Sequence, residues 1–571
     1  MSRNAGEPAT ISREPVWFWL TAVAVLAAGI GLRDPWPADE PRFALVARQM
    51  VESGNWLFPM RGDELYPDKP PLFMWLQAVC YAATGNLRIA FLLPSLLAAL
   101  GTLGLTRDLA RRLWHPQAGA AAGWALLFTL QFTFQAKRAQ IDPLLTFWVT
   151  LSLWALLRHL LVRADWRLWV LGWMAAGLGV ITKGVGVIAL FVLLPAVWAQ
   201  RRGWQGLTTR MRPGAGIFWL GPLAFLLPIL AWLLPMLWTV AQAHDPALQA
   251  YADNILLRQT ATRYARPSHH FQPPWYFLEV IATQWLPTVL ATLWLWPRWR
   301  ERLRERDASV LLLLGWIGLV LLFFTLSPGK REVYVLPALP MLCVALSPWL
   351  QALVQRPRVR VGLFIAAVAL ALTLLVTGSV VALAAPGIEA RLAALRGTIN
   401  ADALGWMLAR IGAAGLLGAL WFGARRGVAA LFAVLACLWI GYGVVGGPLL
   451  NDASSARGLM LAVGARIEPQ AELALVAWKE QNLLMADRPA RTFGFLRDAD
   501  AQLRDARAWQ AQAPGTRWIL IEAGALDACV NRDQAIAMGV SNRREWWLLP
   551  YAASRPGCVP APIANARNDE D

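Results

Sequence analysis

Charged residues are scarce in this sequence. Only 16% of its 571 residues are Asp, Glu, Lys or Arg, while 57% are hydrophobic and the mean hydropathy is +0.44. A soluble domain carries about 25% charged and roughly 45–50% apolar residues. About ten windows approach the roughly 20 apolar residues that cross a bilayer. The composition therefore argues against a soluble enzyme and predicts an α-helical polytopic membrane protein.

Cysteine is also scarce, with five residues in the chain. Cys80, Cys343 and Cys437 lie in or beside apolar runs, which indicates inert packing. Cys529 and Cys558 lie in the polar tail. They could form a disulfide if that tail faces an oxidising compartment, and a pair of free thiols is the alternative.

Several signatures are missing. No Walker A loop is present, which argues against ATP-driven transport. Asp498-Ala-Asp500 has the form of a nucleotide-sugar metal clamp, but it lies beyond the last apolar run, so we interpret it as a chance match. Neither an internal repeat nor a cleavable signal is evident. The net charge of +17 comes mostly from bases in short loops, which indicates membrane topology rather than nucleic-acid binding.

The apolar runs predict about thirteen transmembrane helices. Bounded examples are Val16–Leu32, Ile89–Leu105, Ala118–Phe134, Leu144–Leu161, Ile217–Val240, Trp275–Trp296 and Val428–Val445. Alternate loops are rich in arginine, as in Arg298 to Arg306, and such loops prefer the cytoplasm. The remaining loops, including 34–71 and 241–274, are then periplasmic. Leu72–Ala83 is too short to span the bilayer, which predicts an interfacial or re-entrant helix.

Two domains are expected. Residues 1–445 form the transmembrane domain, and residues 446–571 form a small periplasmic α/β domain. Within that tail, Ala474–Trp478 and Trp518–Glu522 have the composition of buried strands.

Ionisable side chains gather in the predicted periplasmic loops. They are Asp39, Glu40, Arg42, Asp68, Lys69, Lys137, Arg138, Asp142, Arg258, Arg263, His269, His270, Lys330, Arg331 and the nearby Tyr334. Ionisable groups at membrane depth are costly and are usually paired or functional. Cations that converge with acids would suit transfer from a lipid phosphate, because cations hold the leaving phosphate and an acid takes a proton from the acceptor.

Less specific interpretations exist for single residues. Arg42, Arg138 and Arg331 could each be interfacial anchors that extend to the headgroups. Asp142 could merely cap the helix that follows it. The pair His269-His270 could bind a metal, although adjacent loop histidines are more often solvated.

Several motifs occur in a fixed order between about residues 15 and 345. They are Asp39-Glu-Pro-Arg-Phe-Ala, Tyr66-Pro-Asp-Lys-Pro-Pro-Leu, Gln140-Ile-Asp-Pro-Leu-Leu, Leu178-Gly-Val-Ile-Thr-Lys-Gly, Pro274-Trp-Tyr-Phe and Ser327-Pro-Gly-Lys-Arg-Glu-Val-Tyr-Val-Leu-Pro. Together they resemble the aminoarabinose transferase branch of the integral-membrane glycosyltransferases, which is similar to the protein O-mannosyltransferases and has the C-type glycosyltransferase (GT-C) fold. Each motif alone is weak, and their shared order makes the resemblance specific.

The resemblance implies roles for these residues. Asp39 would be the essential acid and Asp142 a second important one. Lys69, Arg263 and Tyr334 would hold the donor phosphate, with Lys330 assisting and Arg258 as the alternative to Arg263. Glu40, Arg42 and Asp68 would support the site. The family usually has Glu where this chain has Asp68, which puts any metal assignment in doubt, so no cofactor is firmly expected beyond a possible divalent metal.

The expected function is inverting transfer of a sugar from undecaprenyl phosphate, with 4-amino-4-deoxy-L-arabinose passing to lipid A at the periplasmic face of the bacterial inner membrane. The expected partners are the lipid-linked donor, an envelope acceptor and membrane lipids, without nucleic acid, and a monomer is expected. Alternatives are transfer of another hexose or mannose to protein or envelope glycan, a lipid-linked sugar transporter or flippase, and a membrane scaffold. A transporter would predict inverted repeats, which we do not find.

Overall fold

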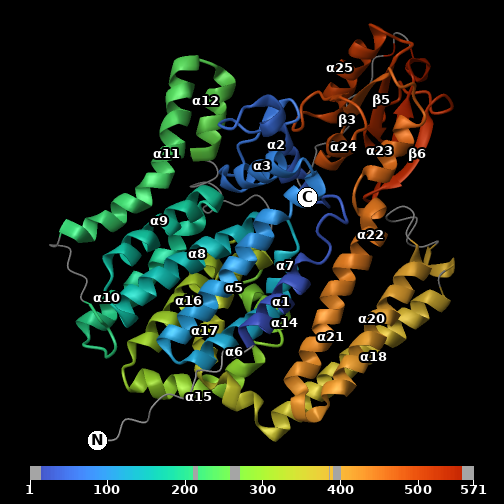
Figure 1. Ribbon diagram of the computed structural model, residues 1–571. Helices are drawn as coiled ribbons and strands as arrows, with labels where there is room; N and C mark the ends of the chain where they lie inside the picture. Colours follow the sequence, from blue (N-terminus) through green and yellow to red (C-terminus); the bar gives the residue numbers. More distant parts are fainter. Residues whose placement is uncertain are drawn as a thin grey trace, which may run out of the picture.

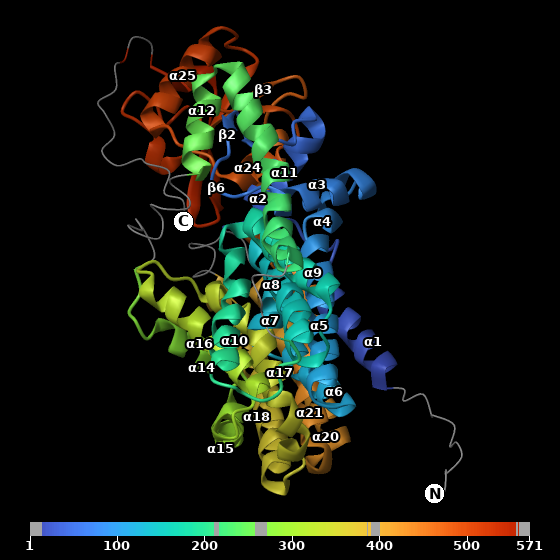
Figure 2. The same cartoon turned by 90° about the vertical axis from the view of Figure 1, so that its left-hand side faces the viewer.

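The computed structural model describes residues 14–209, 216–256, 271–384, 386–389, 400–555 and 558. Figures 1 and 2 show a helical bundle that carries α2, α3 and the C-terminal sheet at one end, which we call the site face. The first helices are α1 (Glu14–Ala27), α2 (Glu40–Ser53), α3 (Leu72–Thr84), α4 (Leu87–Ala90), α5 (Leu93–Leu113), α6 (Pro116–Leu127), α7 (Leu130–Ala136), α8 (Ile141–Leu157), α9 (Trp166–Lys183), α10 (Leu193–Arg201), α11 (Leu220–Ala243) and α12 (Pro246–Asp253).

The second half of the bundle leads into the C-terminal domain. Its helices are α14 (Tyr276–Gln284), α15 (Leu290–Arg304), α16 (Ala308–Leu326), α17 (Ala338–Val354), α18 (Pro357–Leu383), α20 (Ala401–Phe422), α21 (Gly427–Gly441) and α22 (Gly447–Ser454). The C-terminal domain adds α23 (Arg457–Gly464), α24 (Glu480–Met485) and α25 (Ala499–Ala511).

The helices confirm a multi-pass membrane protein. In the described residues, 7 helical stretches are long and apolar enough to cross a membrane, and shorter apolar helices accompany them. The long stretches are Leu87–Leu113, Ile141–Val162, Gly216–Ala243, Ala308–Leu326, Pro357–Leu383, Ala401–Phe422 and Ala424–Ser454. The predicted number of thirteen is not established by these helices.

Two predicted spans are broken. The runs Ala118–Phe134 and Trp275–Trp296 are divided into α6 with α7 and α14 with α15. The breaks face each other, because Leu130 N–H donates to the Leu286 carbonyl at 3.0 Å and the hydroxyls of Thr129 and Thr288 lie 2.6 Å apart. Backbone groups within a membrane must find partners inside the protein. Each break therefore supplies hydrogen-bond partners for polar groups of the other.

The short apolar segment after Pro71 forms α3, as predicted. This helix has 13 residues and ends at Gly85, whose φ of 62° is left-handed. Both views place α3 across the site face rather than along the bundle (Figures 1 and 2). Its length and orientation agree with an interfacial helix.

The first helix ends earlier than its apolar run, at Ala27 rather than Leu32. Gly29 follows with φ 96°, and a Cβ there would lie 2.6 Å from the carbonyl oxygen of Gly443. Only glycine accepts both the left-handed backbone and this close approach. The end of α1 is thus set by contact with the helical stretch Ala424–Ser454, which leads into the C-terminal domain.

The C-terminal domain contains a mixed sheet of five strands in the order β4-β3-β5-β7-β6. They are β3 (Glu472–Val476), β4 (Ala490–Arg491), β5 (Arg517–Glu522), β6 (Ile536–Ser541) and β7 (Arg544–Leu549). β3 pairs in parallel with β4 and β5, while β7 is antiparallel to β5 and β6. The two predicted strands are β3 and β5, so the expected small α/β domain is confirmed. Its boundary after residue 445 stays a prediction.

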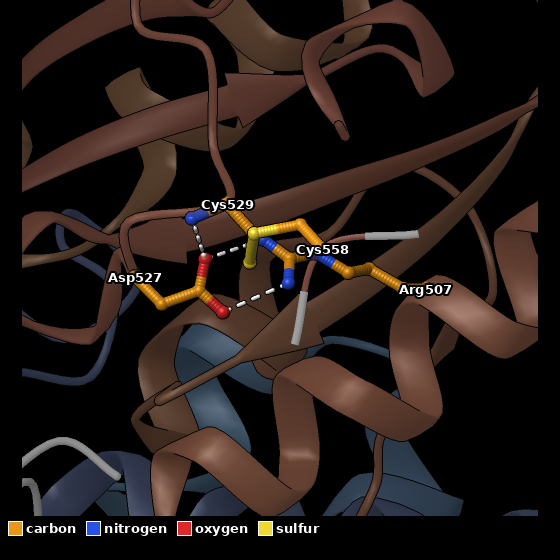
Figure 3. The surroundings of a disulfide bond; sticks show 4 residues. All are labelled: Arg507, Asp527, Cys529 and Cys558. Atoms are coloured by element: carbon orange, nitrogen blue, oxygen red, sulfur yellow. Dashed lines mark hydrogen bonds and ion pairs between the residues drawn. A yellow bond between two sulfur atoms is a disulfide. The ribbon is translucent and has the colours of Figure 1, made fainter. Parts of the chain in front are cut away.

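A disulfide joins Cys529 to Cys558 across 29 residues of sequence. The Asp527 carboxylate lies beside it and accepts hydrogen bonds from both terminal nitrogens of Arg507, at 2.8 and 2.6 Å (Figure 3). Cys529 N–H donates to the same carboxylate at 3.0 Å. The structure thus shows a disulfide rather than two free thiols. The Arg507–Asp527 ion pair holds the segment just before Cys529.

The C-terminal domain shares one hydrophobic core with the first loop of the membrane part. Phe43 of α2 and Phe73 of α3 belong to the same buried cluster as Trp478 and Phe495 of the domain. A small hairpin, β1 (Met60–Arg61) with β2 (Glu64–Leu65), lies between α2 and α3 in the sequence. Because this core is apolar and buried, it fixes the domain against the site face.

Candidate functional site

The first loop is anchored by Glu40, which is 1% exposed. Its carboxylate accepts hydrogen bonds from Arg33 at 2.5 and 2.8 Å and from the backbone N–H of Trp36 and Ala139. Ala139 lies in the loop between α7 and α8, so Glu40 joins two loops that are far apart in sequence. All its bonds are internal, which makes Glu40 a structural support and agrees with the supporting role expected for it.

Asp39 occupies the position just before the first turn of α2, and Pro41 follows within that turn. Its Oδ2 accepts hydrogen bonds from Gln140 Nε2 at 2.9 Å and from Arg331 Nη2 at 3.2 Å. In the part of the chain that the structure describes, no hydrogen bond joins Oδ1 to another residue. Asp39 is therefore held by side chains from two other loops with one oxygen left for a substrate.

The charges around Asp39 keep it ionised. Burial acts to raise the pKa of its carboxyl, but the positive charges of Arg331, Arg42 and Lys69 outweigh burial and hold that pKa below its usual range. Burial likewise acts to lower the pKa of Arg331, and the charges of Asp39 and Asp142 reverse this. Cations thus converge on one carboxylate, an arrangement suited to an anionic ligand.

Asp142 lies in the first turn of α8, and Gln140 rather than Asp142 is the N-cap. The Asp142 carboxylate forms an ion pair with Lys183, at the end of α9. The Lys183 ammonium lies 4.6 Å from the centroid of the Tyr334 ring. Asp142 and Tyr334, two predicted site residues, are therefore joined by a lysine. Asp142 does more than cap a helix.

Arg331 connects this group to Asp39. Its guanidinium contacts Asp39 directly, while the charge of Asp142 and the Tyr334 phenol both act on it. Asp39, Asp142, Lys183, Arg331 and Tyr334 are thus brought together from four separate segments, and we call them the acid–cation cluster. Arg331 is part of this cluster, so it is not simply an interfacial anchor.

The remaining expected residues lie around this cluster in different ways. The charge of Lys69 acts on Asp39, and its Nζ donates to the carbonyl of Asp68 at 3.0 Å. The Asp68 carboxylate lies 3.7 Å from Arg61 Nη1. Arg42 donates from Nε to Glu480 of the C-terminal domain at 2.8 Å. Lys69 thus contributes positive charge at Asp39, whereas Asp68 and Arg42 face other charges as well.

Lys330 is 4% exposed and donates to the carbonyl of Gln272 at 3.0 Å. Phe271 pairs with Gly329 in an isolated β-bridge. The end of the long loop therefore lies against the segment that carries Arg331. Arg258, Arg263, His269 and His270 lie outside the described residues, so their predicted roles stay predictions.

Among the described residues, no group of three or more His, Cys, Asp or Glu side chains lies close enough together to hold a metal ion. Asp68, which stands where the family usually has Glu, faces Arg61 instead. The described residues therefore do not fit a metal centre at this position.

Some site residues carried little sequence signal. Lys183 follows an apolar run within a recognised motif, yet no role was assigned to it. Gln140 is the residue before Ile141-Asp142 and gives no chemical indication of its contact with Asp39. Glu480 lies in the tail, far from every predicted loop. Only the contacts reveal these three.

Comparison with known proteins shows which chains this one is similar to. A family model described as dolichyl-phosphate-mannose-protein mannosyltransferase matches residues 68–233. A Pseudomonas aeruginosa protein named undecaprenyl phosphate-alpha-4-amino-4-deoxy-L-arabinose arabinosyl transferase is 34% identical over 334 residues, which are 57% of this chain and 56% of that protein. A protein of the same name from Enterobacter sp. is 30% identical over 338 residues, 57% of each chain. The match spans just over half the length of these relatives.

A solved structure extends the likeness to nearly the whole chain. The crystal structure of ArnT from Cupriavidus metallidurans, bound to undecaprenyl phosphate, superposes with a TM-score of 0.70 at 20% identity, covering 96% of this chain and 100% of that one. The expected GT-C fold with a small C-terminal domain is confirmed. The predicted resemblance to the aminoarabinose transferases is also confirmed.

Proposed function

We propose that this multi-pass membrane protein is an integral-membrane glycosyltransferase that moves a sugar from a polyprenyl phosphate to an acceptor at the periplasmic face. The observation that carries the proposal is the acid–cation cluster, in which Oδ1 of Asp39 accepts no hydrogen bond from any described residue and lies beside several cations. A polyprenyl phosphate offers the anionic group that such cations recognise. The relatives described above carry names that specify this class of donor.

The proposed reaction is a direct displacement with inversion. An acceptor oxygen attacks the anomeric carbon, and the bond from that carbon to the phosphate oxygen breaks, with the electron pair leaving on the phosphate. Lys69, Tyr334 and, from the resemblance, Arg263 would stabilise the departing phosphate. A phosphate leaves without protonation, so one carboxylate suffices where glycosidases need two.

The electrostatics of Asp39 favour a phosphate acceptor. A carboxyl whose pKa is held low is a weak base. A phosphate monoester, with a second pKa of about 6, is largely ionised near neutral pH and needs little help, whereas a sugar or protein hydroxyl does. We therefore propose transfer of 4-amino-4-deoxy-L-arabinose to lipid A phosphates, with Asp39 taking the remaining proton or stabilising charge at the acceptor.

The proposed location is the bacterial inner membrane with the site face in the periplasm. The arginine-rich α15 lies at the end of the bundle opposite the site face (Figure 1), as expected for a cytoplasmic segment. The Cys529–Cys558 disulfide fits an oxidising compartment. We also propose a monomer as the working unit. The proposed mechanism includes no metal step, and chelation with EDTA should leave transfer unchanged.

The acceptor is tested by comparing envelopes with and without the gene. Deletion should remove the aminoarabinose mass increment from lipid A and increase polymyxin sensitivity, and re-expression should restore both. Unchanged lipid A, together with a lost sugar on protein or envelope glycan, would assign the activity to the alternative in which another hexose or mannose is transferred to protein or envelope glycan. Loss of donor translocation without loss of any transferred sugar would instead support a flippase.

A further inference from the structure

The first turn of α24, in the C-terminal domain, contains three buried polar side chains. Glu480, Gln481 and Asn482 at its start are 3%, 5% and 1% exposed. Charged and amide side chains are rarely buried to this extent unless they are paired. The contacts of Glu480 therefore indicate what this helix does.

Glu480 bridges two arginines of the first loop. Its Oε1 accepts a hydrogen bond from Arg42 Nε at 2.8 Å and lies 3.7 Å from Arg61 Nη1. All three side chains are largely buried. A buried charge persists only when a partner compensates it. A single carboxylate from the C-terminal domain thus helps to neutralise two cations beside the site.

The two arginines connect Glu480 to two segments of that site. Arg42 lies one turn after Asp39 on α2, and its charge acts on the Asp39 carboxylate. Arg61 Nη1 lies 3.7 Å from Asp68, the residue before Lys69. Glu480 is therefore connected through Arg42 to the proposed catalytic acid and through Arg61 to the segment of a proposed phosphate-binding lysine.

The surroundings leave little freedom for adjustment. The Arg61 guanidinium lies 3.8 Å from the centre of the Phe495 ring and 5.3 Å from that of Tyr66. Arg48 of α2 donates to the Leu484 carbonyl of α24 at 3.0 Å. The shared apolar core encloses these contacts. Since packed interiors transmit displacement rather than absorb it, a change at Glu480 should reach Asp39.

We propose that the C-terminal domain completes the catalytic site through Glu480, a positioning residue that holds Arg42 and Arg61 in place. This inference rests on the proposed transferase function. With Glu480 present, the Arg42 guanidinium is held toward the C-terminal domain. Without that charge, the Arg42 guanidinium moves toward Asp39 and displaces its carboxylate from the position needed in the chemical step.

The test is the Glu480→Gln variant of the full-length protein, with undecaprenyl-phosphate aminoarabinose as donor and lipid A as acceptor. The kcat should fall about tenfold while the KM for the donor changes less than about twofold, because misplacement of a reacting group affects the chemical step. Glu472→Gln is the matched control, since Glu472 pairs with Arg517 on the same domain and is 56% exposed. That control should retain the wild-type kcat.

A double variant separates positioning from general damage. If Glu480 acts through Arg42, Glu480→Gln should reduce kcat less than about twofold when Arg42→Gln is already present. An equal reduction in both backgrounds, or an unchanged kcat in the single variant, overturns the inference. Simple loss of folding would lower the recovered amount of enzyme and leave kcat per folded molecule unchanged.

Glu480→Asp covers the case in which the glutamine variant does not fold. It keeps the charge and shortens the reach by about 1.5 Å, so kcat should fall in the wild-type background and not with Arg42→Gln. The wild-type enzyme separates the two proposals. Transfer by wild type with an unaffected Glu480 variant refutes the inference alone, whereas wild type that neither transfers sugar nor binds undecaprenyl phosphate refutes both.

Discussion

Asp34 and Asp39 lie five positions apart in the first loop, and the structure gives them different surroundings. Asp34 accepts two hydrogen bonds from Arg88, at 2.7 and 3.0 Å, and one from Asn451 at 2.7 Å. Arg457 adds a cation 3.6 Å away. These partners come from α4, α22 and α23, so Asp34 ties the first loop to the start of the C-terminal domain.

Asp39 is only partly satisfied by comparison. Its two hydrogen-bond donors, Gln140 and Arg331, both bind Oδ2, and its side chain is 15% exposed. Further cations surround it without hydrogen-bonding to it in the described part of the chain. The difference teaches that a buried acid with a depressed pKa is not by itself reactive. An acid whose oxygens are all occupied stabilises the fold, and one with an open oxygen can meet a substrate.

The largest expected effect separates these two acids. Asp39→Asn should reduce sugar transfer about 10³-fold, within the range for loss of a positioned acid or base, and should leave the melting temperature nearly unchanged. Radiolabelled or mass-spectrometric transfer assays on purified protein measure the rate. Retention of more than a tenth of the wild-type rate would refute the catalytic assignment.

The second effect concerns the lysine that sequence analysis left without a role. Lys183→Met should reduce transfer about 10²-fold, because Asp142 loses its partner beside Tyr334 and Arg331. Lys137→Met is the control, since Lys137 is also a buried lysine of the site face but donates to the backbone of Ala28. Similar losses of kcat in both variants would show that any buried lysine here is needed, contrary to the proposed cluster.

The third effect is on stability rather than rate. Asp34→Asn should lower the free energy of unfolding by about 2 kcal/mol, because it weakens a buried, fully bonded carboxylate, while kcat per folded molecule is retained. Burial acts to raise the pKa of Asp34, and the bonds from Arg88 and Asn451 reverse this. Its contribution is present above the pKa of the unfolded chain and should be lost as pH falls below about 4. Thermal melts in detergent at pH 7 and pH 4 measure both effects. If Asp34→Asn instead keeps the wild-type melting temperature and lowers kcat, Asp34 would be a catalytic residue rather than a structural one.

The smallest expected effect is a shift of the pH profile. Because its folded pKa is depressed, Asp39 should remain ionised and the transfer rate insensitive to it between pH 5 and 8. Arg331→Met removes the nearest cation, so the acid limb of log kcat should move up by about one pH unit. An acid limb that stays in place would mean that Arg331 does not control the ionisation of Asp39.

Much of the fold followed from the order of apolar and basic segments. Spans, the interfacial α3 and the strands β3 and β5 were predicted because hydrophobic length and alternation reflect local burial. The breaks beside Thr129 and Thr288 were not predicted. Each break is tolerated because the other one satisfies its backbone, and such a partnership across 159 positions leaves no local pattern.

Most members of the site were predictable from the sequence, but Lys183 and the pairings between side chains were not. Asp39, Asp142, Lys69 and Tyr334 were identified through motifs that resemble a family. Asp34 is an aspartate in the same loop as Asp39 but lies in no such motif. Only its contacts with Arg88 and Asn451 reveal its structural role. Glu480 is similar, because a short helix in the tail gives no indication that it faces Arg42.

The sequence by itself determined that this chain crosses a membrane many times, which loops share a face and which residue types those loops carry. These properties depend on the transfer of local segments from water to hydrocarbon, a free energy that nearly adds up along the chain. Only the tertiary structure decided that Asp34 has its oxygens bonded and that Asp39 has one oxygen without a hydrogen bond from the described residues. It also decided that Arg42 pairs with the C-terminal domain. Those outcomes depend on contacts between distant segments in a packed interior, where a shift of a single side chain changes which charges meet.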